Sequence, residues 1–172
     1  LSPKRQDDFI LASSMKQVLS WAVFVTVIFF FLIPSLVSAD LFINEFVSDT
    51  KGTTADPDWV EIYNSGSESV DLSPYRLRDN TATNKIDLEG ILNSGGYATF
   101  NWTNKLNKDG DVIKLLLISS EEVINQVGYG DAGIDVSSPV VGQSAGRQSD
   151  GTNTWVIFSS STGGFFLQQD KG

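Results

Sequence analysis

A stretch of strict alternation limits the folds that this chain can adopt. Residues 58–64 read Asp-Trp-Val-Glu-Ile-Tyr-Asn, so Val60 and Ile62 share one side, and Glu61 lies on the other between two aromatic residues. A period of two in β-branched and aromatic residues predicts a β-strand. Turn-forming residues stand on both sides of it. We therefore expect a core strand with Val60 and Ile62 pointing inward.

Short segments of the same kind recur about every ten residues from residue 40 onward, with turn signals between them and no helical period. This spacing indicates an all-β fold, a β-sandwich or a small barrel. The long segment 130–150 shows no clear period, and no strand is assigned to it. The expected strands are 41–47, 58–64, 70–72, 75–78, 85–92 (a weaker candidate because of Gly90), 97–102, 112–118, 123–129 and 154–158.

The composition excludes several chemistries. The chain has no cysteine and no histidine, which removes disulfides, the usual zinc ligands and every Ser-His or Cys-His catalytic pair. Its formal net charge of −9 disfavours binding to a phosphate backbone, which requires clustered lysine and arginine. We expect no nucleic acid partner and no cofactor.

The N-terminal part resembles a targeting segment. Met15 begins a short basic region, followed by the apolar run 18–33 and small residues at Val37 and Ala39. This order predicts a secretory signal peptide over 15–39, helical in its apolar part and cleaved after Ala39, with 1–14 as an upstream extension. An uncleaved membrane anchor is the alternative, although the run of 16 residues is short for a span.

Several short motifs follow one another over about residues 40–164. They are Ile43-Asn44-Glu45-Phe46, the stretch 58–64, Val70-Asp71-Leu72 with Tyr75-Arg76-Leu77, Gly96-Tyr97, Leu106 with Gly110-Asp111, Val127-Gly128-Tyr129, Arg147, Asp150-Gly151 and Trp155. This ordered set resembles the lamin tail domain (LTD) family, in which such pieces occur in the same order.

The resemblance implies an immunoglobulin-like β-sandwich over 40–164, followed by a C-terminal tail at 165–172. It also implies the prokaryotic extracytoplasmic kind of this domain, found on secreted or surface proteins, often beside hydrolase or nuclease domains. The segment 161–164 departs from the family because it lacks a proline. The sequence therefore does not predict how the chain continues after the last strand.

Carboxylates are the first candidates for a binding role. Asp49, Asp56 and Asp58 share one loop, and Glu45 and Glu61 stand on adjoining strands, so they could converge on Ca²⁺. Their spacing does not match an EF-hand, and aspartate is common in turns for backbone reasons. We favour turn chemistry, and we expect Asp109-Gly110-Asp111 to form a hairpin turn. No catalytic or metal residue is assigned.

Glu61 needs a partner because it lies among rings in the middle of a strand. We expect a hydrogen bond or an ion pair to a neighbouring strand or loop, with Arg76, Arg78 or Arg147 as candidates.

The aromatic residues allow two interpretations. They could form a platform on which sugars stack, but rings in a sandwich more often fill the core. Asn101-Trp102-Thr103 is the only glycosylation sequon of the chain. The aromatic residues concerned are Trp59, Tyr63, Tyr75, Tyr97, Trp102, Tyr129 and Trp155.

These observations predict a non-catalytic binding or adhesion module, secreted or at the cell surface. Its partner would be a protein or a surface glycan, contacted through the loop 48–58 and the segment 130–150. The membrane would be touched only by an uncleaved N-terminal segment. The alternative is an accessory domain of a hydrolase or nuclease whose catalytic part lies outside this sequence.

Overall fold

The computed structural model describes residues 40–51, 53 and 55–161. Within this part the regular elements are strands. They are β1 (Leu41–Val47), β2 (Trp59–Asn64), β3 (Val70–Asp71), β4 (Tyr75–Arg78), β5 (Lys85–Asp87), β6 (Ile91–Leu92), β7 (Tyr97–Asn101), β8 (Gly110–Leu117), β9 (Val123–Gly130), β10 (Ser144–Arg147) and β11 (Trp155–Phe158).

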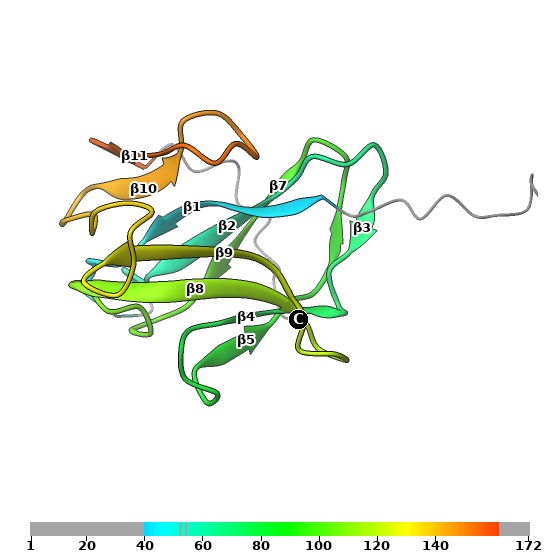
Figure 1. Ribbon diagram of the computed structural model, residues 1–172, viewed down its shortest axis with the longest axis horizontal. Coiled ribbons are helices and arrows are strands. Elements are labelled where there is room, and N and C mark those ends of the chain that lie inside the picture. The colour runs from blue at the N-terminus through cyan, green and yellow to red at the C-terminus, as the bar shows by residue number, and fades with distance from the viewer. Residues whose placement is uncertain (1–39, 52, 54, 162–172) are drawn as a thin grey trace, which may run out of the picture. The chain divides into compact units, whose positions relative to one another are not determined.

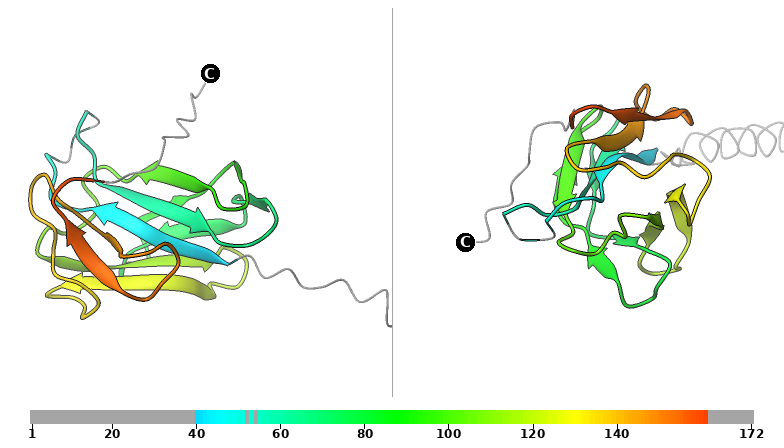
Figure 2. Two further views of the ribbon diagram at one scale, coloured as in Figure 1. Left: turned by 90° about the horizontal axis from the view of Figure 1, so that it is seen from above. Right: turned by 90° about the vertical axis from the view of Figure 1, so that its left-hand side faces the viewer.

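The strands form two layers, which confirms an all-β, sandwich-like fold (Figure 1). One layer is a five-stranded sheet in the order β11-β10-β1-β2-β7, and the other is a four-stranded sheet in the order β5-β4-β8-β9. The described pairings between named strands are antiparallel. Strands β3 and β6 form a small separate pair. Figure 2 shows the same layers from two further directions.

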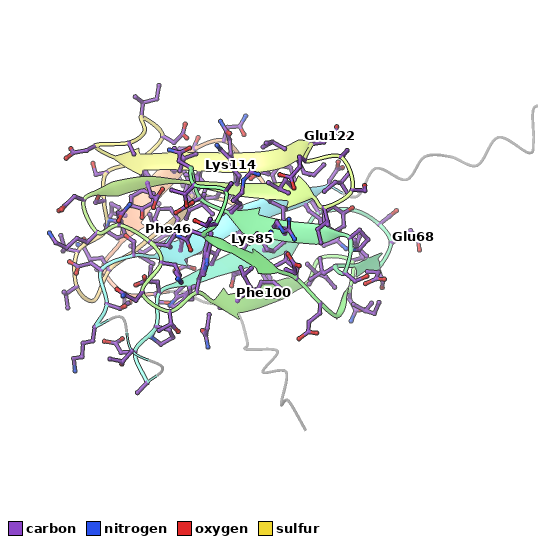
Figure 3. All side chains as sticks on the ribbon, turned by 90° about the horizontal axis from the view of Figure 1, so that it is seen from below. Phe46, Glu68, Lys85, Phe100, Lys114 and Glu122 are labelled. Atoms are coloured by element: carbon purple, nitrogen blue, oxygen red, sulfur yellow. The ribbon has the colours of Figure 1, made fainter. Side chains whose placement is uncertain are left out.

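The core lies between the two layers. Val60 and Ile62 are fully buried there, as the alternation predicts. Phe46 of β1 packs on Tyr129 of β9, with their ring centroids 4.6 Å apart, and so joins the sheets. Figure 3 shows the side chains that fill this space, with Phe46 labelled. Other core residues are Leu41, Ile43, Leu72, Leu77, Leu88, Leu92, Ala98, Trp102, Leu106, Ile113, Leu115, Val127 and Ala145.

A bulge in β1 changes which side chains face the core. Ile43 pairs with Ile62, but the next pair along is Glu45 with Glu61, so Asn44 is the extra residue on β1. Ile43 and Phe46, three positions apart, are therefore both buried in the core. The bulge also brings the two glutamates opposite each other on neighbouring strands.

Three local expectations are wrong. The segment 85–92 is not one strand: it divides into β5 and β6, because Gly90 has a φ of 99° that interrupts the extended backbone. The segment 130–150, to which the sequence pattern assigns no strand, contains β10. Gly110 and Asp111 belong to β8, so only the residues before them form a turn.

The expected signal segment 15–39 and the tail 165–172 lie outside the described residues. The part of the chain that the structure describes holds no helix that is long and apolar enough to cross a membrane.

Candidate binding surfaces

Polar side chains form a buried network around the bulge. Glu45 and Glu61 are each only 2% exposed, and Asn44 is 6% exposed. The Asn44 Nδ2 atom donates to Glu61 Oε1 at 3.2 Å and to Asp150 Oδ1 at 3.0 Å. The Tyr97 hydroxyl donates to the other oxygen of Asp150. Burial, followed by this contact with Asp150, raises the pKa of Tyr97. The network links β1, β2, β7 and the loop after β10.

Glu61 therefore finds its hydrogen bond on the neighbouring strand β1, as expected, but through Asn44. Two of the arginines proposed as partners, Arg76 and Arg78, bond instead to acidic residues of the four-stranded sheet. These residues lie on β5 and in the turn between β8 and β9. Arg76 contacts Asp87 through Nε at 2.6 Å and Glu121 at 3.5 Å. Arg78 contacts Glu121 as well. These pairs are solvent-accessible, so their contribution to stability is small.

The third arginine, Arg147, is a buried structural connector. It is 5% exposed, and its guanidinium carbon lies 4.8 Å from the Trp155 ring centroid and 5.3 Å from that of Phe42. Its nitrogen atoms donate to the carbonyl oxygens of Ile43 and Thr152. Burial lowers the pKa of Arg147. The sequence did not assign this role, because the contacts join strands that are far apart in the chain.

The loop aspartates satisfy backbone groups. Asp58, 3% exposed, accepts from Thr50 Oγ1 at 2.7 Å and from the N–H groups of Lys105 and Leu106 at 3.1 and 3.2 Å. Asp56 accepts from the N–H of Lys51 at 3.1 Å. These contacts support the turn interpretation. Among residues 40–51, 53 and 55–161, no group of three His, Cys, Asp or Glu side chains converges as metal ligands would.

Asp111 is buried at the start of β8. Its Oδ1 atom accepts from its neighbour's N–H, Val112 N, at 2.8 Å, and its Oδ2 atom accepts from the Asn107 side chain at 3.1 Å. Burial is the largest influence on this carboxyl group and raises its pKa, although both hydrogen bonds act in the opposite direction.

The aromatic residues separate into two groups. Tyr63 of β2 and Tyr97 of β7 are cross-strand neighbours with ring centroids 5.0 Å apart, and both are half-buried. Trp59 lies on the same strand as Tyr63 and is also half-buried. The other four lie in the core or pack against it, as the core interpretation expects: Tyr75, Trp102, Tyr129 and Trp155.

The larger cleft lies between β11 and the segment 130–140 and has a volume of about 950 Å³. Trp155, Val156 and Ile157 of β11 form one wall. The other wall includes Ile134, which is fully exposed, and Val140, which is 56% exposed. We call this cleft the β11 groove. It contains part of the predicted contact segment 130–150.

A second, smaller cleft of about 550 Å³ adjoins the loop 48–58. Its lining includes Asp49, Pro57, Trp59 and the exposed side chain of Val141. Both segments that the sequence suggested as contact surfaces therefore border a concave surface. In the sequon, Asn101 is exposed at the end of β7, while Trp102 is 3% exposed.

Comparison with family models identifies the domain. The model described as Lamin Tail Domain matches residues 34–131, which is more than half of the chain. The chain belongs to the lamin tail domain family. Its domain is an immunoglobulin-like module, in agreement with the two sheets described above. The matched span ends at residue 131, so β11 and most of the segment 130–140, the two walls of the β11 groove, lie outside it. A search of curated proteins gave no match.

Proposed function

We propose that this lamin tail domain is a non-catalytic, extracytoplasmic binding module, secreted or held at the cell surface, and that the β11 groove is its main contact surface. The groove is the observation that supports the proposal most strongly. It places exposed apolar side chains, Ile134 and Val140, beside the last strand of a sheet. Exposed apolar groups gathered at a concave site are typical of protein interaction surfaces.

The chemistry of the buried polar groups agrees with a binding role. Asp58 and Arg147 bond to backbone groups, and Asn44 links Glu61 to Asp150. These side chains hold loops and strands in place. The surfaces that we assign to a partner are the groove, the smaller cleft beside the loop 48–58 and the rings of Trp59, Tyr63 and Tyr97 on the sheet.

A photo-crosslinking amino acid placed in the full chain at Ile134, in cells that produce it, tests the contact surface. Ile134 is 100% exposed at the groove, and Ile91 of β6 is a control that is 60% exposed and lies outside the groove. The proposal predicts a discrete cross-linked species from position 134 that is absent from position 91. The same species from both positions, or none from 134, would contradict it.

The location is tested separately by fractionating cells and determining the first residue of the mature protein. Export with cleavage predicts Asp40 as the first residue, in the extracytoplasmic fraction. A chain that stays in the cytoplasm with residues 15–39 intact would refute this part of the proposal.

A further inference from the structure

The free border of β11 lacks the charged or covering residues that stand at the two borders of the four-stranded sheet. Strand β11 ends the five-stranded sheet, and it reads Trp-Val-Ile-Phe without a polar residue. The other end of the same sheet, β7, includes the polar residues Thr99 and Asn101. At one end of the four-stranded sheet, β5 carries Lys85 and Asp87 on its three residues. The border of β9 is partly covered, because Tyr129 forms a bridge with Val136. Proteins usually protect edge strands with charges, prolines or covering segments. Strand β11 has a groove there instead.

The register shows which backbone groups of β11 point into that free space. The N–H of Gln148 donates to the carbonyl of Thr154 at 2.8 Å, one step beyond the pair Arg147 and Trp155. Hydrogen-bonded and non-bonded pairs alternate in an antiparallel ladder. The pairs of Val156 and Phe158 with β10 are therefore the bonded ones. The N–H and C=O groups of Trp155 and Ile157 point away from β10.

The groove beside these groups is acidic. Four aspartates and one lysine line it, an excess of three negative charges (4 − 1 = 3). Lys108 pairs with one of them, Asp109, at 2.7 Å. The aspartates are Asp49, Asp109, Asp131 and Asp135. An acidic groove attracts cationic segments and repels acidic ones.

We propose that β11 is a docking edge for an extended peptide segment that alternates Lys or Arg with apolar residues. The segment adds as a strand to β11, so its backbone bonds to the N–H and C=O groups of Trp155 and Ile157. Its apolar side chains contact the wall around Ile134 and Val140, and its cationic side chains reach the aspartates. The inference rests on the proposed binding function and names the class of partner.

The probe is a synthetic fluorescent nonapeptide of alternating lysine and valine, titrated by anisotropy against the purified full chain. Three peptides serve as comparisons: glutamate in place of lysine, N-methyl groups on all backbone nitrogens, and a scrambled order of the same residues. The proposal predicts saturable, salt-sensitive binding of the first peptide. Binding should be lost for the glutamate and N-methyl peptides and weakened for the scrambled one.

Protein variants locate the binding. Asp131→Lys should weaken it by about tenfold, because it reverses one charge of the groove. Glu68→Lys makes the same change at an exposed residue of the turn after β2, labelled in Figure 3, and should leave the affinity unchanged. Ile157→Pro should abolish binding, because proline removes an N–H that points at the partner. If Ile157→Pro does not fold by circular dichroism, Asp131→Lys decides alone.

Several results would overturn the inference. Equal binding of the N-methyl peptide would show that the attraction needs no strand pairing. An equal loss in Glu68→Lys would show that the overall negative charge, not the groove, binds the peptide. Dimers in the ultracentrifuge that Ile157→Pro abolishes would assign the edge to a second copy of the chain. A cross-link from position 134 in cells without peptide binding would refute this inference and keep the binding function.

Discussion

The Nε atom of Arg147 donates a 2.8 Å hydrogen bond to the carbonyl oxygen of Ile43, and both residues also donate to one atom of the opposite sheet. That atom is Asn125 Oδ1 of β9, which accepts from Ile43 N at 3.1 Å and from Arg147 Nη2 at 3.1 Å. Three strands from two layers, β1, β9 and β10, thus meet at a single polar junction. The junction fixes β10, and β10 in turn carries the edge strand β11.

Replacing Arg147 should destabilise the domain strongly. Arg147→Met keeps most of the stem but leaves the carbonyl oxygen of Ile43 buried without its donor, so we expect a loss of about 2–4 kcal/mol in the free energy of unfolding. Arg78→Met is the control, because its contact with Glu121 is exposed and should contribute at most about 1 kcal/mol. Urea unfolding of both variants measures the difference. Equal losses would show that the junction has no special role.

Asp58 should be required for its side-chain oxygens. Asp58→Ala removes both of them, so the Thr50 hydroxyl and the N–H groups of Lys105 and Leu106 lose their acceptor. We expect a loss of about 1–3 kcal/mol in the free energy of unfolding. Asp56→Ala, in the same loop but more exposed, should change it by less than about 1 kcal/mol. A calorimetric melting temperature that is unchanged in Asp58→Ala would contradict the assigned contacts.

Asp111 should make the domain less stable as the pH rises, which is the reverse of the usual effect of a carboxyl group. Its pKa is raised by burial above the ordinary value of 3.8, so folding favours its protonated form. The stabilisation is fully present below that ordinary value and is lost as the pH rises through the raised pKa. Relative to Asp111→Asn, the wild type should therefore lose stability over this range. A difference that stays constant with pH, or grows in favour of the wild type, would contradict the raised pKa.

Gly133 should be needed for the shape of the β11 groove. A Cβ atom at this position would lie 2.1 Å from the backbone carbon of Gly128, so the segment that carries Ile134 would have to move in Gly133→Ala. Gly142→Ala is the control, since its Cβ would meet nothing within 4 Å and only its φ of 81° is unfavourable. We expect amide shifts in β9 and β11 by NMR for Gly133→Ala, and local shifts alone for Gly142→Ala. Similar spectra for the two variants would disprove the close packing.

The sequence predicts the strands better than their connections. The alternation at Val60 and Ile62 identifies a core strand because side-chain period and burial are directly linked. The four-residue strand β10 has no such pattern: all of its residues are buried, and it includes the polar residues Ser144 and Arg147. The gap between β5 and β6 depends on the positive φ of Gly90; this glycine marks 85–92 as a weaker candidate but does not show that the segment divides into two strands.

The binding surfaces were predicted only as segments. Their chemistry depends on contacts over long separations in the chain, such as the groove between β11 and residues 130–140. The hydrogen-bond donor to Glu61 also could not be predicted from the sequence pattern. An arginine is the usual ion-pair partner, but the bulge at Asn44 turns a nearby amide toward the carboxylate. A bulge adds one residue to a strand, and nothing in the pattern around 43–46 marks it.

The claim on which the docking model depends is that the backbone groups of Trp155 and Ile157 are unpaired at the edge of β11. Hydrogen exchange measured by NMR on the full chain tests it directly, residue by residue. We predict fast exchange at Trp155 and Ile157, slow exchange at Val156, and slower exchange at Trp155 and Ile157 once the lysine–valine peptide is added. Slow exchange at Trp155 and Ile157 in the free protein, or rates that the peptide leaves unchanged, would contradict the model.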